Sequence, residues 1–308
     1  MKAMRVLVTG ASGFVGVHLV GRLAAAGHEV CVLPSSGFRA ARLAGLPYAV
    51  VSEADRARAE LVYHLASTPL AASVDDCQHS RVIVGGMAQL LDRLRRCPPR
   101  LLVVAGSAAE YGPGRLCGEA QTLAPDTVFG MLKAAAWELA RVSGMDAVLM
   151  RLFTPYGPGE AAGRLIPSAA AAAVAGARLR LRTTGEQTRD YVHVAEVAEA
   201  LVQAGVRRPP LEPGVAINIC SGVERRAIDV ARQIFILAGR APGDVAPGVE
   251  PPGELAVSSG NPGRARGLLN WRARLPFESG LREALAAAYE QRHTNKGDAI
   301  DYDGRRGA

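Results

Sequence analysis

The sequence predicts an α/β fold in which a doubly wound parallel sheet is joined to a smaller C-terminal lobe. Two observations carry this prediction. Short apolar runs typical of buried strands alternate with stretches of helical periodicity through the first half of the chain. These runs are continuously apolar, which is typical of parallel strands that are covered by helices on both faces.

The elements can be followed along the chain. The helix predicted over Phe129–Val142 is apolar on nearly every side, so we expect it to be covered by the sheet and by a second copy in a homodimer, the alternative being a monomer in which the smaller lobe covers it. A helix over Ile166–Ala175 and the Pro- and Gly-rich region after Ser221 would form the smaller lobe. The other predicted elements are strands over Arg5–Val8, Glu29–Leu33, Leu61–Leu65, Leu101–Val104, Ala147–Phe153 and Ala216–Ile219, and helices over Val15–Ala26 and Ile83–Leu94.

Composition narrows the class of protein. With 49% hydrophobic and 21% charged residues, the 308-residue chain can bury one large core. No signal peptide or membrane span is recognisable, so we expect a cytoplasmic protein that binds no membrane. The five cysteines are scattered without metal-ligand spacing, which predicts reduced thiols and no metal site. The net charge of +7 comes from dispersed arginines, which favours small anionic ligands over nucleic acid.

A glycine-rich turn follows the first predicted strand and opens the first helix. This is the setting in which a dinucleotide binds, because glycines let the backbone approach a pyrophosphate and the helix N-terminus favours its negative charge. The residues that we expect to contact the cofactor here are Thr9, Gly10, Ser12, Gly13, Phe14, Val15 and Gly16.

The end of the second strand predicts which dinucleotide binds. Proteins that choose NAD usually place an acidic residue there, but here Leu33 is followed by Pro34 and no carboxylate. Ser35 and Ser36 can instead donate hydrogen bonds to a 2′-phosphate, and Arg39 can pair with it. We therefore expect NADPH/NADP+. The alternative is that Arg39 is only a solvated residue of a surface helix.

These signals divide the chain into domains. Residues 1–157 and 186–222 would form the NADP-binding domain, and residues 158–185 and 223–290 the substrate-binding lobe. The polar stretch 291–308 is rich in Gly, Asp and Arg and is expected to be a disordered tail.

The chain resembles the extended short-chain dehydrogenase/reductase family, which includes nucleotide-sugar epimerases and dehydratases. The resemblance implies a Rossmann-type fold and further cofactor contacts from Leu65, Ala66, Ser67, Phe153 and Pro155. It rests on the motifs Thr9–Gly16, Tyr63–Ala66, Ser107–Gly112, Arg151–Pro158, Gln187–Val194 and Asn218–Gly222.

The same resemblance implies catalytic residues, and here the chain departs from the family. Members use a Ser or Thr, a Tyr, a Lys four residues after the Tyr, and an Asn on an earlier helix. Ser107 matches the Ser and Lys133 the Lys, but Phe129 stands at the Tyr position and Ile83 near that of the Asn. Phe cannot exchange the proton that a phenol would.

Three functions remain open from the sequence. The first is an NADPH-dependent ketoreductase that reduces an activated carbonyl of a small-molecule substrate, since reduction needs only a late proton source. Such a protein resembles atypical ketoreductases of aromatic polyketide (angucyclinone) pathways in antibiotic biosynthesis. The second is a nucleotide-sugar epimerase or dehydratase, which Thr154 weakens because those members commonly carry Asn there. The third is a catalytically inactive NADP(H)-sensing protein.

Overall fold

The computed structural model describes residues 3–35, 37–54, 58–68, 75–249 and 256–298. The chain splits into two compact units. Unit 1 comprises Met1–Pro155, Thr188–Glu224 and Leu255–Arg274, and unit 2 comprises Tyr156–Gln187, Arg225–Glu254 and Leu275–Ala308. The segment Leu255–Arg274 thus groups with the sheet, whereas the sequence placed it in the smaller lobe.

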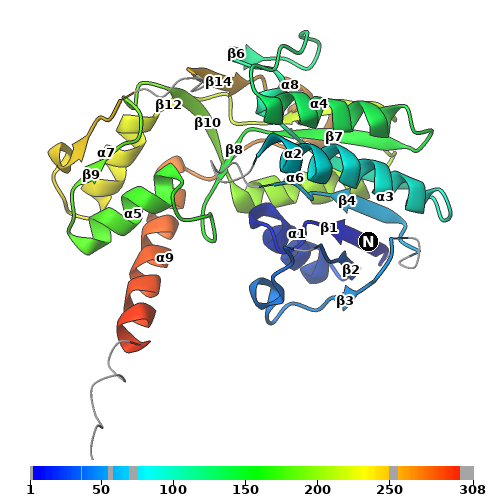
Figure 1. The fold of residues 1–308 in the computed structure, drawn as a ribbon, viewed down its shortest axis with the longest axis horizontal. Coiled ribbons are helices and arrows are strands. Elements are labelled where there is room, and N and C mark those ends of the chain that lie inside the picture. Colours follow the sequence, from blue (N-terminus) through cyan, green and yellow to red (C-terminus); the bar gives the residue numbers. More distant parts are fainter. Residues whose placement is uncertain (1–2, 36, 55–57, 69–74, 250–255, 299–308) are drawn as a thin grey trace, which may run out of the picture. The chain divides into compact units, whose positions relative to one another are not determined.

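Unit 1 is built on a seven-stranded sheet with the strand order β11-β7-β5-β4-β1-β2-β3 (Figure 1). Every pair of neighbours in it is parallel, so the predicted doubly wound α/β fold is confirmed. The strands of this sheet are β1 (Arg5–Thr9), β2 (Glu29–Leu33), β3 (Ala49–Val50), β4 (Leu61–His64), β5 (Leu101–Ser107), β7 (Ala147–Leu152) and β11 (Ala216–Ile219).

Helices pack on both faces of this sheet, and alternate strand residues supply the two cores. On β1, Val6 and Val8 join the cluster that includes α1 and α6, while Leu7 joins the cluster that includes α3 and α4. The helices of unit 1 are α1 (Phe14–Ala25), α2 (Asp76–Ser80), α3 (Gly86–Leu94), α4 (Val128–Arg141), α6 (Val194–Val206) and α8 (Gly263–Leu269).

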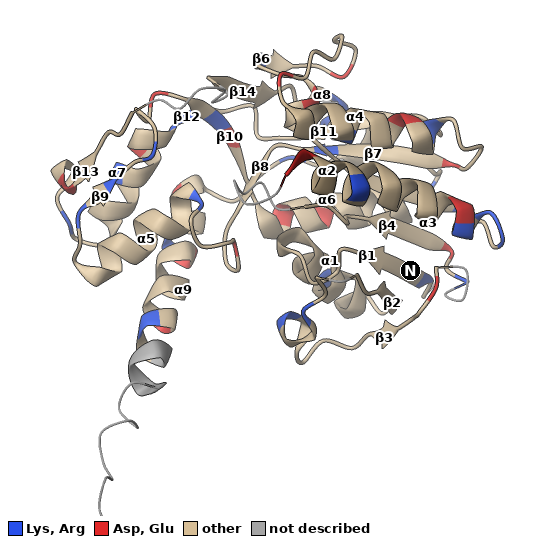
Figure 2. Cartoon of the chain, in the orientation of Figure 1, with Lys and Arg blue, Asp and Glu red and all other residues tan. Residues whose placement is uncertain are grey.

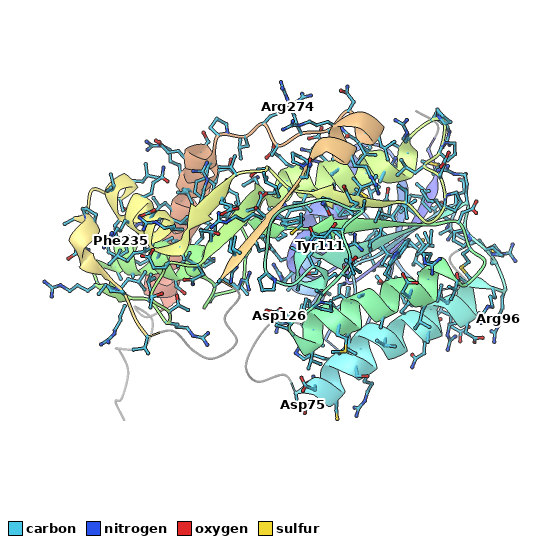
Figure 3. The ribbon with its side chains drawn as sticks, turned by 90° about the horizontal axis from the view of Figure 1, so that it is seen from above. Asp75, Arg96, Tyr111, Asp126, Phe235 and Arg274 are labelled. Atoms are coloured by element: carbon cyan, nitrogen blue, oxygen red, sulfur yellow. The ribbon has the colours of Figure 1, made fainter. Side chains whose placement is uncertain are left out.

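The predicted element bounds differ most at one helix. The sequence predicts a helix over Ile83–Leu94, but a π-helical turn occupies Arg81–Gly85 and joins α2 to α3. Figure 3 shows α4 running beside this helical stretch, and both α2 and α3 pack against it. Within the chain α4 keeps one exposed face, because Met131 and Leu139 are 56% and 36% exposed. The homodimer expected to cover that face stays a prediction.

A smaller group of strands and turns completes unit 1. β10 (Thr188–His193) pairs in parallel with β14 (Val257–Gly260), which pairs with β6 (Gly114–Cys117). Asp190 fastens these elements, since its carboxylate accepts hydrogen bonds from the backbone of Ser221, Gly222 and Gly260. The remaining short elements of unit 1 are the single turns Ala40–Leu43 and Ala108–Glu110, while β8 (Thr154–Tyr156) and β12 (Glu224–Arg226) include the positions at which the chain passes from unit 1 to unit 2.

Unit 2 is mainly helical. α5 (Leu165–Ala175) packs against α7 (Ala227–Leu237) and α9 (Phe277–Asp298), and β9 (Leu179–Arg180) pairs with β13 (Val245–Ala246) beside a turn at Pro242–Asp244. Because α9 continues to Asp298, residues 291–298, expected to be disordered, are helical. Residues 299–308 of the expected tail lie outside the described residues.

Charged residues are dispersed over the elements of both units (Figure 2). Most of the ion pairs in the described parts of the chain join partly exposed side chains, such as Arg93 with Glu53 at 2.8 Å, and pairs of this kind contribute little to stability. No helix in these parts is long and apolar enough to cross a bilayer.

Candidate functional site

The glycine-rich turn between β1 and α1 is shaped by close backbone contacts. Gly10 has φ +70°, and a Cβ on it would lie 2.6 Å from the backbone nitrogen of Ala66. A Cβ on Gly16 would lie 2.2 Å from the carbonyl oxygen of Gly10. Neither position tolerates a side chain, so the turn packs directly against the segment that follows β4.

The N-terminus of α1 faces the loop after β2. Gly13 caps the helix, Phe14 and Val15 begin it, and Ser12 accepts a hydrogen bond through Oγ from the backbone N–H of Arg39 at 3.1 Å. This bond brings Arg39, which is exposed, beside the turn. The end of a helix whose backbone N–H groups are unpaired favours an anion, and a guanidinium nearby adds positive charge.

The other predicted cofactor residues are placed as follows. Ser35 lies exposed just after β2, while Ser36 lies outside the described residues. Leu65 is partly buried and donates its N–H to the carbonyl of Thr9 at 3.1 Å. Ala66 underlies Gly10, and Ser67 is exposed.

His64 connects the turn to the centre of the sheet. Thr9 at the end of β1 hydrogen-bonds through Oγ1 to His64 Nδ1 at 2.8 Å. Burial, with a smaller contribution from the charge of Lys133, lowers the pKa of His64 to about 3. This imidazole is therefore neutral near pH 7.

Lys133 is held at the middle of unit 1 by α4. Its side chain is buried, and Nζ donates to the carbonyl oxygen of Ala105 on β5 at 2.5 Å. Burial lowers the pKa of Lys133, and the nearby Glu110 carboxylate opposes that shift. An ammonium in this position can still donate two further hydrogen bonds.

Local contacts fix the start of α4. Thr127 caps the helix, its Oγ1 accepting the N–H of Gly130 at 3.1 Å. A Cβ on Gly130 would lie 2.2 Å from the carbonyl oxygen of Ala109, so glycine allows the helix to touch the turn after β5. Phe129 consequently lies one helical turn before Lys133 and beside the turn that follows β5.

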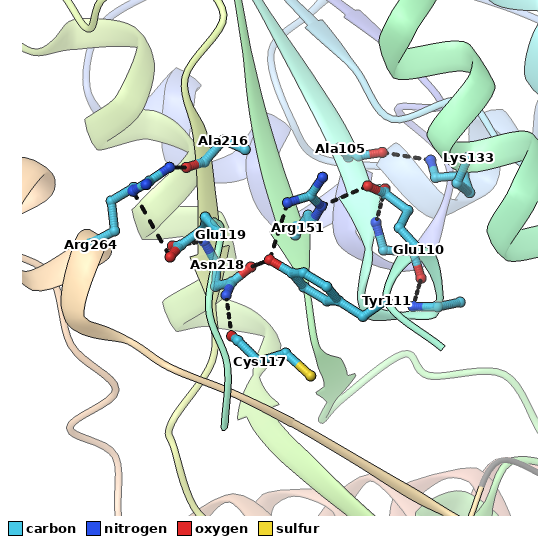
Figure 4. A network of polar contacts seen from close by, with 12 residues as sticks. Ala105, Glu110, Tyr111, Cys117, Glu119, Lys133, Arg151, Ala216, Asn218 and Arg264 are labelled. Carbon is cyan, nitrogen blue, oxygen red and sulfur yellow. Dashed lines mark hydrogen bonds and ion pairs between the residues drawn. The ribbon is translucent and has the colours of Figure 1, made fainter. Parts of the chain in front are cut away.

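Ser107 ends β5 and begins that turn. Its Oγ accepts the N–H of Ala109 at 3.2 Å, and its own N–H donates to Glu110 Oε1 at 2.7 Å. The second oxygen of Glu110 accepts from Arg151 Nε at 2.7 Å, with both side chains buried (Figure 4). The Ser107 hydroxyl proton remains available to a ligand.

Tyr111 and Phe153 belong to the support of the site. The Tyr111 hydroxyl donates to Asn218 Oδ1 at 2.9 Å and accepts from Arg151 at 3.1 Å, as Figure 4 shows. Burial raises the pKa of Tyr111. Phe153 is 1% exposed and packs with Tyr111 and Cys220, so its side chain is in the core and only its backbone can meet a cofactor. Pro155, predicted with it, is partly buried.

A pair of polar side chains that was not predicted from the sequence lies beside Phe129. Thr68 Oγ1 and His79 Nδ1 are 2.5 Å apart, and both residues are buried. The His79 ring meets that of Phe129 edge to face, with centroids 5.9 Å apart. The only sequence signal is that His79 precedes Ile83, the residue near the family's Asn position, by one helical turn.

The geometry thus assembles two groups, on β1 and on β5, with β4 lying between these two strands. Around β1 lie the glycine turn and Arg39, which are suited to the phosphates of a dinucleotide. Around β5 lie Ser107, Lys133 and Phe129, which are suited to position a carbonyl oxygen and a ribose. Among the described residues no set of three His, Cys, Asp or Glu side chains is arranged to hold a metal ion.

Comparisons with known proteins agree with this architecture. Residues 6–220 match the model of the NAD dependent epimerase/dehydratase family. The UDP-glucose 4-epimerase of Mycolicibacterium smegmatis is 30% identical, over 92% of this chain and 97% of that protein. A 3-diazoavenalumate denitrifying reductase of a Streptomyces species is 33% identical over 65% of this chain and 72% of that protein.

Solved structures give the same result. The Thermus thermophilus UDP-glucose 4-epimerase in complex with NAD superimposes with a TM-score of 0.81 and 29% identity, covering 92% of this chain and 99% of that one. Against DesIV, a dTDP-glucose 4,6-dehydratase of Streptomyces venezuelae, the TM-score is 0.86 at 22% identity, which shows the shared fold. The chain is a member of the NAD-dependent epimerase/dehydratase family, within the extended short-chain dehydrogenases/reductases.

Proposed function

We propose that the protein is an NADPH-dependent ketoreductase that reduces an activated carbonyl of an aromatic polyketide of the angucyclinone type, without a tyrosine as proton donor. The observation that carries the proposal is Phe129, which stands one turn before the buried Lys133 in a site that otherwise keeps the cofactor turn and Ser107.

The residues of the turn fit the cofactor. Gly10 and Gly16 keep the backbone open, α1 presents its N-terminus, and Arg39 lies beside Ser12 where a 2′-phosphate would sit. Lys133 would bind the nicotinamide ribose, and Ser107 would hydrogen-bond the carbonyl oxygen of the substrate. The nicotinamide supplies the hydride, and the protein supplies orientation and positive charge.

The chemistry of Phe129 favours reduction. Oxidising an alcohol requires a base that takes its proton as the hydride leaves, and a phenyl ring cannot do so. Reducing a ketone requires a proton only late, and a ketone polarised by a neighbouring phenol carries part of that assistance itself. Relatives that are reductases support this direction, among them a dTDP-4-dehydro-6-deoxy-D-allose reductase of Streptomyces bikiniensis at 28% identity.

The second candidate function is a nucleotide-sugar epimerase or dehydratase, favoured by the epimerase that matches 92% of this chain. It requires reversible oxidation of the sugar and hence a base in place of Phe129. The third is an inactive NADP(H)-sensing protein, for which Ser107 would serve only as the cap of its turn and Lys133 only as a clamp on the cofactor.

The test compares three classes of substrate with NADPH and NADH in parallel. The probes are 8-hydroxy-1-tetralone, whose ketone is hydrogen-bonded to its own phenol, 1-tetralone without that phenol, and UDP-glucose with NAD+. The wild type is assayed beside Phe129→Tyr and Lys133→Ala.

We expect NADPH-dependent reduction of the phenolic ketone, a small effect of Phe129→Tyr in that direction, and loss of turnover in Lys133→Ala. Epimerisation of UDP-glucose by the wild type would replace the proposal with the second function. Tight NADPH binding without any turnover, even in Phe129→Tyr, would replace it with the third.

A further inference from the structure

A reductase without the family's tyrosine still has to protonate the alkoxide that hydride transfer forms. The polar side chains of the candidate site are therefore candidates for the proton source. Several of them are engaged elsewhere. Tyr111 is tied to Asn218 and Arg151, and the neutral His64 is bonded to Thr9, where its lowered pKa of about 3 keeps it from carrying a proton.

His79 differs from these groups in its surroundings. Its ring lies edge to face with Phe129, so it stands beside the ring whose tyrosine counterpart would carry the phenol. Its Nδ1 is bonded to Thr68, and Nε2 has no hydrogen bond to the residues that the structure describes. The hydrogen bond fixes the ring plane, and the opposite nitrogen is left for a ligand.

We propose that His79 is the proton donor of the reduction, acting from Nε2 and positioned by Thr68, on a ketone bound against Phe129. The proposal rests on the reductase function proposed above. Histidine is suited to this work because an imidazole exchanges protons close to neutral pH, and a positioned general acid contributes on the order of 10²–10⁴ in rate.

The step balances as follows. The carbonyl carbon receives the hydride with its electron pair from NADPH, which is oxidised to NADP+, and the carbon–oxygen π bond opens. The oxygen takes the proton from Nε2 of the imidazolium, so an alcohol forms. The neutral imidazole keeps its proton on Nδ1, where it donates to Thr68 Oγ1, and solvent returns the lost proton to Nε2. Thr68 thus selects the nitrogen that reacts.

The arrangement also accounts for the aromatic residue at position 129. A ring there packs against the His79 ring, whereas a phenol would bring a second acid to the same carbonyl oxygen. The two donors are alternatives, because the rings at positions 79 and 129 touch each other. A tyrosine restored at 129 should therefore relieve the need for His79.

The experiment uses the full-length enzyme with 8-hydroxy-1-tetralone and NADPH, and compares wild type, His79→Asn, Phe129→Tyr with His79→Asn, and His293→Asn. The last is the matched control, since His293 is exposed on α9 in unit 2. We expect kcat to fall about 100-fold or more in His79→Asn, to recover at least tenfold in the double variant, and to stay unchanged in the control. Fluorescence titration should give the same Kd for NADPH in all four.

A second measurement does not depend on turnover. In wild type labelled with ¹⁵N at histidine, addition of the alcohol product with NADP+ should shift the His79 Nε2 resonance and leave that of His293 in place. Thr68→Val should shift the tautomer balance of the same ring. These signals also apply where His79→Asn is poorly folded.

The outcomes separate the two proposals. A wild type that reduces no carbonyl removes the reductase function and His79 with it. A reducing wild type with undiminished kcat in His79→Asn overturns only the role of His79. So does a loss that tyrosine at 129 does not restore while NADPH still binds, or a His79 resonance that the product leaves unmoved.

Discussion

The turn between β1 and α1 and the start of α4 belong to the same candidate site, but they differ in the residue types that they carry. At the turn, each position where the backbone has to approach closely is still glycine, as Gly10 and Gly16 show. At the start of α4 the backbone contacts are equally tight at Gly130, yet the side chain beside it is Phe129, at the position where the sequence resemblance implies a tyrosine.

The difference separates two requirements of the chemistry. Holding a dinucleotide depends on backbone shape and charge, which cannot be changed without losing the ligand. Delivering a proton depends on one side-chain atom, which can be supplied from another position or by the substrate. The predictions below test whether these requirements are as separable as the structure indicates.

The largest effect is expected for Gly10→Ala. The added Cβ would collide with the backbone of Leu65 and Ala66, so NADPH binding should be lost, and unfolding should be at least about 2 kcal/mol easier. The matched control is Gly27→Ala, which has φ +80° but nothing within 4 Å of its Cβ and should lose only about 1–2 kcal/mol. Thermal unfolding and fluorescence titration measure both. Unchanged NADPH affinity in Gly10→Ala would show that the close approach is dispensable.

Lys133→Met should abolish reduction. It should also show how the Lys133 ammonium makes the free energy of unfolding depend on pH. The folded protein lowers the pKa of Lys133. Between that lowered pKa and the ordinary value of about 10.4, the unfolded chain holds a proton that the folded chain has released. The stability of the wild type relative to Lys133→Met should therefore rise as pH increases through this window.

Urea unfolding of both proteins from pH 7 to 10.5 checks this, because other groups titrate in both and cancel in the difference. A difference that stays constant, or that moves in favour of Lys133→Met at high pH, would contradict the lowered pKa. Exposed Arg95→Ala serves as the control for a lost charge that should leave the pH profile alone.

Arg39→Ala sharpens the comparison from the side of the cofactor. If Arg39 pairs with the 2′-phosphate, the Kd of NADPH should rise about tenfold, and that of NADH should stay within about twofold. Isothermal titration with both cofactors measures this. Equal losses for the two would mean that the Arg39 side chain does not recognise the 2′-phosphate, since the hydrogen bond from the Arg39 backbone N–H to Ser12 is kept in Arg39→Ala.

The smallest effect on activity is expected at the outer face of α4. Met131 is 56% exposed within the chain, so Met131→Glu should leave kcat within about twofold and unfolding free energy within about 0.5 kcal/mol. If a homodimer covers this face, light scattering should show the variant as a monomer beside a dimeric wild type. A monomeric wild type would remove the dimer proposal.

The sheet could be predicted from the sequence because its strands and helices follow local patterns. The strands Glu29–Leu33 and Ala216–Ile219 were predicted with the bounds that the structure gives them. The π-helical turn at Arg81–Gly85 could not be predicted, since a run of apolar residues does not distinguish it from an α-helix.

The site was predictable in the same uneven way. The turn at Gly10 and the positions of Ser107 and Lys133 followed from short motifs. The functional roles of these residues remain predictions. The contact of Thr68 with His79 joins a loop to a helix 11 positions later and has no motif. Likewise, the ion pair of Glu110 with Arg151 spans 41 positions, so only the folded chain brings its members together.

The way in which α4 is anchored has a consequence for how such enzymes diversify. The Thr127 cap and the contact of Gly130 with Ala109 set the backbone on both sides of position 129 without using its side chain. The side chain at that position can therefore change while the backbone of the helix stays in place. A single nucleotide change could replace tyrosine with phenylalanine there. The fold would be kept, and another group would then supply the proton.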